Sequence, residues 1–300
     1  MTRTHVNLLL LFIALIWGST FVAQSHGMHD VGPMTFTGVR FLIGSLVIAP
    51  LMLREWRALK ARGLALNRDD GFRIVGLGLL ITMGAVMQQV GMVSSSVTHA
   101  VFLTALYVPL VPMLSWLLLR AAPHWSVWPA AAASVVGTYL LSGMNNISLD
   151  TGDLWVIAST LPWALHVLLV GRVADRMAAP FLVAGGQFLV CGVISLAWAV
   201  LAEPISSAGL QAALLPILYA GVLAVGVAFT AQVVAQRYAQ ATDAAIILSS
   251  ETLFAAFFGY ALMGDRLDTA GLLGCALILA GIVLVQIAPM LGVRRNAPCH

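Results

Sequence analysis

The sequence predicts an all-α membrane protein with ten transmembrane helices, arranged as two inverted five-helix repeats around a central cavity. Three observations support this fold class. The composition is 60% apolar with only 9% charged residues, long apolar runs recur along the whole chain, and the two halves match at a nearly constant offset. A soluble domain carries about 25% charged residues to cover its surface. Most of this surface is therefore expected to face lipid.

Ten apolar runs are long enough to cross the hydrocarbon core of a bilayer, which takes roughly 20 helical residues. The runs are Val6–Gln24, Pro33–Leu53, Phe72–Val93, Val97–Leu119, Val127–Gly143, Asp153–Gly171, Pro180–Leu201, Ala212–Ala235, Thr242–Met263 and Thr269–Met290. They are about twice as long as membrane β-barrel strands and show no period-two alternation, so helices are expected. The first run is expected to span rather than to act as a signal peptide, because no small-residue cleavage site follows it.

The basic residues predict the orientation. Ten spans place both termini on one side of the membrane. If that side is the cytoplasm, 13 of the 15 Lys and Arg lie inside, the exceptions being Arg40 within a helix and Arg266 in an outside loop. This asymmetry follows the positive-inside rule and predicts a plasma (inner) membrane protein with cytoplasmic termini. Because the basic residues lie in short connections rather than along a groove, no nucleic-acid partner is expected.

The cysteines and histidines form no pattern typical of metal or disulfide chemistry. Cys191, Cys275 and Cys299 lack the spacing of a disulfide framework or a metal site. The sequence contains no His-x-x-x-His pair and no Gly-x-Ser-x-Gly turn. No metal and no cofactor are therefore expected, and a membrane-embedded enzyme is disfavoured.

The two halves of the chain repeat each other. A shift of 144 residues pairs Gln88 with Gln232, and a shift of 146 pairs Trp17 with Trp163. We therefore divide the chain into a first repeat, 1–144, and a second repeat, 145–300. Because each repeat has five spans, an odd number, the second enters the membrane from the opposite side, as in many secondary transporters.

Several segments resemble a known family of transporters. They are Trp17–Phe21 (WGSTF), Val39–Leu42 (VRFL), Ala105–Leu119 (ALYVPLVPMLSWLLL) and Ser249–Asp268 (SSETLFAAFFGYALMGDRLD). These segments resemble the EamA repeat of the drug/metabolite transporter superfamily, and within it the chain is most similar to the YddG-like amino-acid exporters. The resemblance implies a ten-helix basket with a central cavity that exports small metabolites, often amino acids, from the cytoplasm.

One turn departs from the pattern of that family. The family commonly ends the fourth helix with a Gly-Glu-Arg-like turn, where this chain has Arg120-Ala121-Ala122. The second half keeps a related turn, Gly264-Asp265-Arg266. The resemblance therefore implies that a structural ion pair is missing from the first half.

Four unusual residues are predicted to lie near the middle of the membrane. At 1.5 Å per residue, Trp17, Tyr107, Trp163 and Glu251 lie roughly 14–17 Å deep, half of a ~30 Å core. Solutes bind at this depth in inverted-repeat transporters, so all four are predicted to bind substrate. An ionised Glu251 in hydrocarbon costs several kcal/mol. It is therefore either anchored to a neighbouring helix or functional, through proton coupling or recognition of a substrate ammonium.

The other candidate residues each have a structural alternative. Trp17 and Trp163 can form an aromatic wall or simply pack helices. Arg40 can bind a substrate carboxylate, pair with Glu251, or extend toward the membrane surface. His166 lies one turn from Trp163 and is a candidate substrate contact or proton relay, or a hydrogen-bonded packing residue.

A further set of residues is predicted to act along the transport path. Gln88 and Gln232, expected near opposite ends of the path, and His99, expected near the outer rim, are candidate gate contacts, although interhelical hydrogen bonds would also account for the two glutamines. Pro109 and Pro162 are candidate hinges because proline releases a backbone carbonyl and bends a helix. Proline is nevertheless common in membrane helices.

The function predicted from these residues is secondary transport. We expect export of small metabolites, amino acids first among them, by alternating access, with a small solute, the lipid bilayer and a coupled proton as partners. Glu251 with nearby tryptophans would also suit a lipophilic-cation/proton antiporter. A nucleotide-sugar or sugar-phosphate carrier should show several buried basic residues, where only Arg40 qualifies. From other classes, a membrane-embedded enzyme and a scaffold remain alternatives, and a channel lacks a repeated filter loop.

Overall fold

The computed structural model describes the chain apart from residues 65, 96, 142–149, 264–267 and 294–300, and apart from the side chains of 97–99, 262–263 and 290–293. Every regular element in the described part is a helix, which confirms the predicted all-α class. The helices are α1 (Arg3–Gly27), α2 (Pro33–Ala61), α3 (Arg68–Met92), α4 (Val97–Thr104), α5 (Tyr107–Leu119), α6 (Val127–Leu141), α7 (Thr151–Met177), α8 (Pro180–Ala202), α9 (Ser207–Ala212), α10 (Leu214–Tyr219), the π-helix η1 (Ala220–Phe229), α11 (Thr230–Ala235), α12 (Ala241–Leu248), α13 (Glu251–Phe258), the π-helix η2 (Gly259–Met263) and α14 (Thr269–Val293).

Nine helical segments of the described chain are long and apolar enough to cross a membrane. They coincide with nine of the ten predicted spans. The tenth prediction, Val127–Gly143, corresponds to α6, a shorter apolar helix of 15 residues. Since residues 142 and 143 lie outside the described part, the count of ten stays a prediction.

Two helices extend well past the apolar runs that predict them. α2 continues eight residues beyond Leu53, and α7 continues six residues beyond Gly171. Both extensions carry Arg and other charged residues, so a criterion based on apolar length ends the helix too early. Leu59 shows why the first extension stays ordered, because it is buried in the same apolar cluster as Met177 and Ala179.

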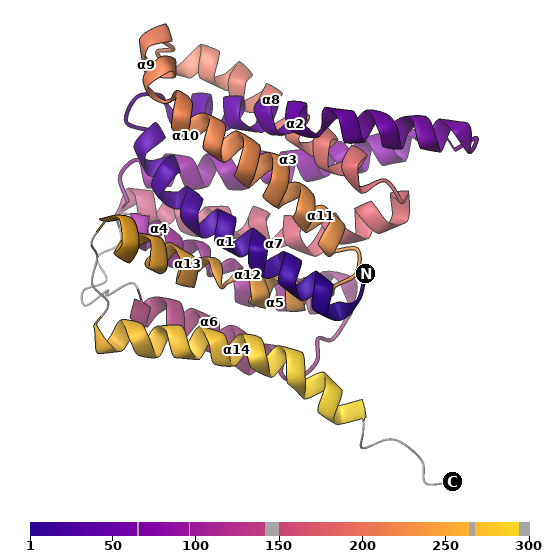
Figure 1. Cartoon of the computed structure of the whole chain (residues 1–300), viewed down its shortest axis with the longest axis vertical. Coiled ribbons are helices and arrows are strands. Elements are labelled where there is room, and N and C mark those ends of the chain that lie inside the picture. The colour runs from indigo at the N-terminus through magenta and orange to yellow at the C-terminus, as the bar shows by residue number, and fades with distance from the viewer. Residues whose placement is uncertain (65, 96, 142–149, 264–267, 294–300) are drawn as a thin grey trace.

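The helices run side by side through an elongated bundle (Figure 1). α2 and α8 lie at one edge, α6 and α14 lie at the opposite edge, and α1, α3 and α7 lie between them. The start of α1 and the end of α14 lie at the same end of the bundle. The core between the edges is therefore the region where a buried site can form.

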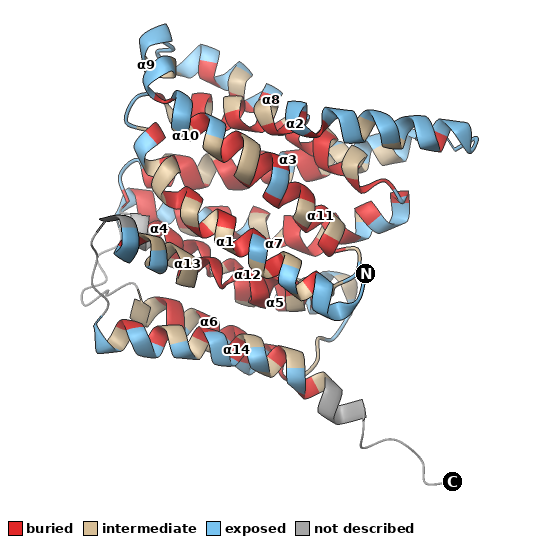
Figure 2. Ribbon diagram, in the orientation of Figure 1, coloured by how far each residue is buried: buried red, intermediate tan, exposed pale blue. Residues whose placement is uncertain are grey.

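The outer surface of this bundle carries many large apolar side chains, and its interior contains polar ones as well as an apolar core. Buried residues gather in the middle of the bundle, and exposed ones lie along its outer helices (Figure 2). Among the exposed ones are large apolar side chains, with Leu46 and Leu117 each 72% exposed. Buried ones include polar residues such as Gln88, Gln232 and Glu251. Lipid, rather than water, is the solvent that this distribution suits.

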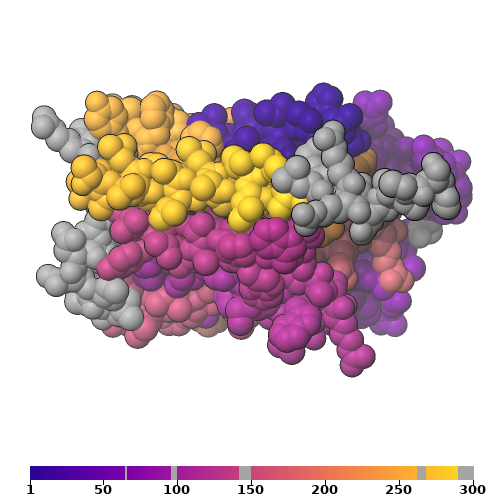
Figure 3. All heavy atoms as spheres, turned by 90° about the horizontal axis from the view of Figure 1, so that it is seen from below, coloured from indigo at the N-terminus to yellow at the C-terminus, as the bar shows by residue number. Residues whose placement is uncertain are grey.

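Antiparallel pairs of helices form the frame of the bundle. α2 packs along α8, α3 along α7, and α6 along α14. A Cβ atom added at Gly137 of α6 would lie 2.6 Å from the carbonyl oxygen of Gly274 in α14, so only glycine permits this backbone approach. Figure 3 shows α14 and α6 side by side across the lower face of the molecule.

Two carboxylates hold the α2–α8 pair by its ends. Glu203, which follows α8, accepts hydrogen bonds from the backbone N–H groups of Met34 (2.7 Å) and Thr35 (2.8 Å) at the start of α2. At the opposite end, Glu55 of α2 accepts a hydrogen bond from the backbone N–H of Leu182 at the start of α8 (2.7 Å). Each helix thus satisfies the open N–H groups of the other, where the helix dipole also favours negative charge.

Removing one of these carboxylates should destabilise the bundle. In Glu203→Ala the two N–H groups lose a charged acceptor, and we expect a loss of about 1–2 kcal/mol of unfolding free energy. Thermal unfolding of the purified protein in detergent would measure this as a lower Tm. Asp30→Ala, an exposed carboxylate near the same end of the bundle, is the control and should leave the Tm unchanged. Equal Tm values for the two variants would contradict the capping role.

Candidate functional site

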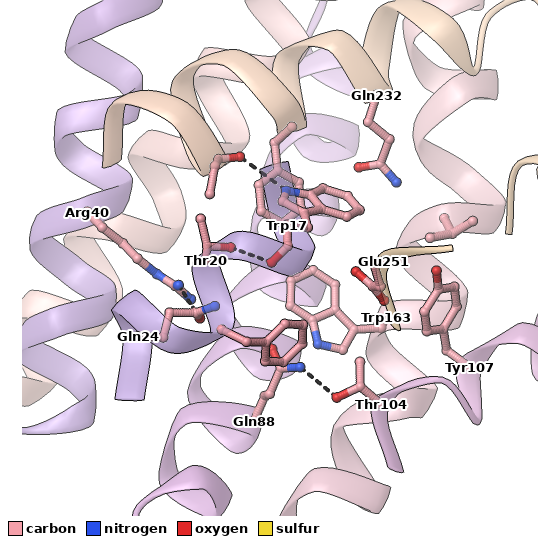
Figure 4. A pocket seen from close by; sticks show the side chains of 14 residues that line it. Trp17, Thr20, Gln24, Arg40, Gln88, Thr104, Tyr107, Trp163, Gln232 and Glu251 are labelled. Carbon is pink, nitrogen blue, oxygen red and sulfur yellow. Dashed lines mark hydrogen bonds between the residues drawn. The ribbon is translucent and has the colours of Figure 1, made fainter. Parts of the chain in front are cut away.

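A cavity of about 70 Å³ lies in the middle of the bundle, and residues from both halves of the chain line it. The lining consists of Trp17, Thr20, Phe21, Gln24, Arg40, Gln88, Thr104, Tyr107, Trp163, Val167, Ala224, Phe229, Gln232 and Glu251 (Figure 4). We call this cavity the central pocket. One water needs roughly 10–15 Å³ of such space, so the central pocket has room for a small solute.

Most of the residues predicted to carry transport meet in the central pocket. Seven of them line it: Trp17, Arg40, Gln88, Tyr107, Trp163, Gln232 and Glu251. They come from α1, α2, α3, α5, α7, α11 and α13. Depth along the apolar runs was the signal for four of them, Trp17, Tyr107, Trp163 and Glu251. Gln88 and Gln232 were expected near opposite ends of the path, but both line this one pocket. Their individual roles stay predictions.

The remaining predicted residues lie elsewhere. His166 is fully buried behind the pocket wall, where its Nε2 lies 3.0 Å from Oε1 of Gln187, because three residues after Trp163 the helix turns its side chain toward α8. Pro162 lies in the uninterrupted helix α7, beside the pocket rather than in its lining. The side chain of His99 lies outside the described residues.

An aromatic wall closes one side of the central pocket. The rings of Trp17 and Phe229 have centroids 4.6 Å apart, and Trp163 stacks on Phe229 at 5.8 Å with an interplanar angle of 17°. The indole Nε1 of Trp17 donates a hydrogen bond to the carbonyl oxygen of Ala224 (3.3 Å), which fixes the first ring. Phe229 therefore joins the two predicted tryptophans into one surface.

Phe229 had no signal in the sequence that singled it out. It ends the π-helix η1, in which backbone hydrogen bonds run from i to i+5 and helical periodicity no longer applies. Thr20 and Gln24 were also missed, although a signal existed. They follow Trp17 by three and seven residues and so share its face of α1.

The predicted fourth span is broken next to the central pocket. α4 ends at Thr104, Ala105 and Leu106 form a turn, and α5 begins at Tyr107. Pro109 accounts for the break, because it has no N–H to donate to the carbonyl oxygen of Ala105. That oxygen instead accepts from the N–H of Val108, at 3.0 Å. The break aims Tyr107 into the pocket.

The matching span of the second half is broken at the same repeat position without a proline. α12 ends at Leu248, and α13 begins at Glu251, which a shift of 144 pairs with Tyr107. Here hydroxyl groups satisfy the backbone: Ser249 Oγ donates to the carbonyl oxygen of Ile246 (2.6 Å), and Ser250 Oγ donates to that of Ile247 (2.7 Å). Side-chain bonds of this kind compete with the helical ladder. A proline in the first half and serine hydroxyls in the second thus interrupt the two matching spans at the same repeat position beside the pocket.

Several polar groups of the central pocket have no hydrogen-bond partner among the described residues. One is Nε of Arg40, and the others are Oη of Tyr107, Nε1 of Trp163, and both Nε2 and Oε1 of Gln232. The Glu251 carboxylate, only 5% exposed, likewise makes no hydrogen bond or ion pair within the described part. We call those of Tyr107, Trp163, Gln232 and Glu251 the open polar groups. Leaving a buried polar group unbonded costs about 1–3 kcal/mol, so the open polar groups require water or a solute.

Arg40 lies on the other side of the pocket from the open polar groups (Figure 4). It is 5% exposed, donates a hydrogen bond from Nη1 to Oε1 of Gln24, and lies over the rings of Phe36 and Phe41 at 5.4 and 5.3 Å. It forms no ion pair with Glu251 in the described structure, and it does not extend to the surface. The pocket thus contains a guanidinium and a carboxylate that are not bonded to each other.

A second cavity, of about 420 Å³, lies between the ends of α5, α7 and α11 and the start of α12. Arg172, Asp175, Gln236 and Arg237 contribute to its polar lining. Val167 lines both this cavity and the central pocket. Val167 therefore lies between the two cavities.

A bundle of apolar helices around a polar cavity is the construction of a multi-pass membrane transporter. A family model described as "EamA-like transporter family" matches residues 5–143 and again residues 150–287. The chain therefore belongs to the EamA-like transporter family, within the drug/metabolite transporter superfamily.

Similar proteins agree with this assignment. An "Uncharacterized transporter" of Archaeoglobus fulgidus is 29% identical over 285 residues, which cover 95% of this chain and 87% of the relative. "Uncharacterized transporter YoaV" of Bacillus subtilis is 23% identical over 288 residues, covering 93% and 96%. A protein of known crystal structure shares the fold with a TM-score of 0.76 and 19% identity, over 99% of this chain and 100% of its own.

The proline at the first break offers a test of the site geometry. In Pro109→Ala, a backbone N–H becomes available to the Ala105 carbonyl, so the helix can continue and turn Tyr107 away from the pocket. We expect the Tm to stay the same or rise, and solute uptake into liposomes to fall roughly tenfold, the equivalent of about 1.4 kcal/mol. Pro112→Ala, the same change one turn further along α5, should retain uptake. Normal uptake by the Pro109 variant would show that the break does not matter.

Proposed function

We propose that this transporter exports small zwitterionic metabolites, amino acids first among them, by alternating access of the central pocket. The observation that carries the proposal is the charge arrangement of the pocket. A buried carboxylate and a buried guanidinium face one cavity without bonding each other, and an aromatic wall lies between them. A solute with one positive group, one negative group and an apolar part matches all three features.

Each feature favours a specific part of such a solute. The Glu251 carboxylate attracts an ammonium, and the indoles of Trp17 and Trp163 stabilise the same cation through their ring faces. The Arg40 guanidinium attracts a carboxylate. The wall that includes Phe229 accepts an apolar side chain. A polyanion such as a sugar phosphate would instead meet one buried Arg and a repelling Glu.

The arrangement of the helices supports two inverted repeats, 1–144 and 145–300. The antiparallel α2–α8 pair exchanges carboxylate caps between its two ends, as a pseudo-two-fold axis would require. α3 packs along α7, and in the matching position α1 packs along η1. The helix breaks before Tyr107 and Glu251 are related by the same shift. Two such halves can exchange roles and convert an outward-open state into an inward-open one.

The proposed orientation follows from charge. The end of the bundle where the chain begins also carries the basic residues of 54–73 and the second cavity, which includes Arg172 and Arg237. The positive-inside rule places this end in the cytoplasm, with the protein in the plasma (inner) membrane and both termini inside. The second cavity is then the cytoplasmic entrance, and Val167, which lines both cavities, is part of the inner barrier to export.

A second function has one specific observation in its favour. Trp17, Trp163 and Phe229 surround the side of the pocket near Glu251 with aromatic rings, which is also how a lipophilic cation is held. A cation/proton antiporter would use Glu251 to exchange the two ions. It would leave the Arg40 guanidinium with no anionic group to attract, so we place it behind the zwitterion exporter.

Uptake into liposomes tests the proposed function. Purified protein in liposomes should move labelled neutral amino acids in a saturable way, and an imposed pH gradient should alter the rate if a proton is coupled. Glu251→Gln should reduce this uptake by roughly tenfold or more, because a charge-assisted hydrogen bond contributes about 1.5–3 kcal/mol. Asp30→Asn, the same chemical change outside the pocket, should not.

The outcomes separate the two functions. Movement of a lipophilic cation without any movement of amino acids would replace the exporter by the antiporter. Amino-acid uptake that is unchanged in Glu251→Gln, with the same Tm as the wild type, would remove Glu251 from the mechanism.

A further inference from the structure

The two glutamines that the repeat relates have different surroundings. Gln88 donates a hydrogen bond from Nε2 to Oγ1 of Thr104 at 2.7 Å, and that hydroxyl donates in turn to the carbonyl oxygen of Ala100 at 2.6 Å. Gln232 has the same burial and lines the same pocket, yet both polar atoms of its amide lack a partner in the described chain. The internal repeat is therefore broken at this pair.

The sequence supplies the reason for the asymmetry. Thr104 follows Gln88 by 16 residues, and the residue 16 positions after Gln232 is Leu248. Leu248 is fully buried in the same apolar cluster as Ala228 and Ala235, which lie one helical turn on either side of Gln232. Where the first half places a hydroxyl, the second half thus places an apolar side chain that cannot bond the amide.

The free amide lies on the same side of the pocket as Glu251 and Tyr107. Figure 4 shows the Gln232 side chain pointing into the pocket toward this side, with Arg40 on the far side of Trp17. An α-amino acid carries its ammonium and carboxylate on one carbon, so the groups that bind them must be neighbours. Figure 4 shows Trp17 between Arg40 and Glu251, so Gln232, and not Arg40, lies beside the carboxylate.

We propose that Gln232 is a specificity-determining residue that binds the carboxylate of an α-amino acid whose ammonium is bound by Glu251. This rests on the proposed function. The amide Nε2 offers two N–H donors and the Tyr107 hydroxyl offers a third, which a carboxylate can accept together. Leu248 keeps the amide available, and Arg40 attracts the anionic group from the far side of the pocket without being its ligand.

The proposal can be tested by supplying the missing hydroxyl. In L248T the new hydroxyl should accept a hydrogen bond from the Gln232 amide, as the Thr104 hydroxyl accepts one from Gln88. The Gln232 amide would then no longer be free to bind a carboxylate. L248V has nearly the same shape without the hydroxyl and is the matched control. We expect the KM for L-leucine uptake into liposomes to rise roughly three- to tenfold in L248T relative to L248V, the range for one hydrogen bond. The KM for leucinamide, which has no carboxylate, should be the same in L248T and L248V.

A second background shows whether the hydroxyl acts through Gln232. Q232M removes the amide at similar volume, so its KM for leucine should already be raised. In this background L248T and L248V should have equal KM values for leucine, because no amide is left for the hydroxyl to bond. If L248T does not fold, a comparison of Q232M with Q88M tests the proposal. Q232M should raise the KM for leucine several-fold and lose the preference for leucine over leucinamide, whereas Q88M should keep that preference.

Three results would overturn the proposal. Equal leucine KM values for L248T and L248V, with both proteins folded, would show that the Gln232 amide does not bind the carboxylate. A difference in leucine KM between L248T and L248V that persists in Q232M would show that the hydroxyl acts through packing and not through the Gln232 amide. In either case the proposed function would survive, because the wild type still transports leucine. A wild type that transports no amino acid would overturn both the inference and the proposed function.

Discussion

Keeping polar and ionisable side chains inside a bundle that lipid surrounds is the constraint on which the rest of this structure depends. Each such group costs free energy unless something bonds it. Around the central pocket most of the backbone is satisfied within helices, and the two helix breaks are stabilised by a 3₁₀-type turn before Tyr107 and by serine hydroxyls before Glu251. Several side chains that face the central pocket nevertheless keep polar atoms without a partner among the described residues.

The frame around this pocket combines rigid pairs with interrupted helices. α2 and α8 are joined at both ends by the carboxylates of Glu55 and Glu203, and α6 and α14 approach closely at Gly137. The broken spans and the π-helix η1 lie next to the pocket instead. Continuous outer pairs around discontinuous inner helices suit the alternating access that we propose.

Much of this could be predicted from the sequence, and the failures have physical causes. Apolar length located nine spans, and depth along them collected Trp17, Tyr107, Trp163 and Glu251 into one pocket. Side-chain direction was harder: for His166 a solute contact and a hydrogen-bonded packing role were both open, and the structure has the second, with the side chain turned toward Gln187. Phe229 was missed because a π-helix has no 3.6-residue period. The extensions of α2 and α7 were missed because they contain charged residues, so apolar length does not identify them as helix, although tertiary packing stabilises them.

Access to the two cavities from the two sides of the membrane tests the central claim most directly. Single cysteines at Thr20 in the central pocket and Thr242 in the second cavity, on a background without the native cysteines, would be labelled by an impermeant thiol reagent applied to one side at a time. The account predicts that Thr242 is labelled from inside, and that Thr20 is labelled from outside in one state and from inside in the other, so that leucine changes the two labelling rates of Thr20 in opposite directions. Labelling of Thr20 from one side only, or a rise of both of its rates together, would contradict alternating access.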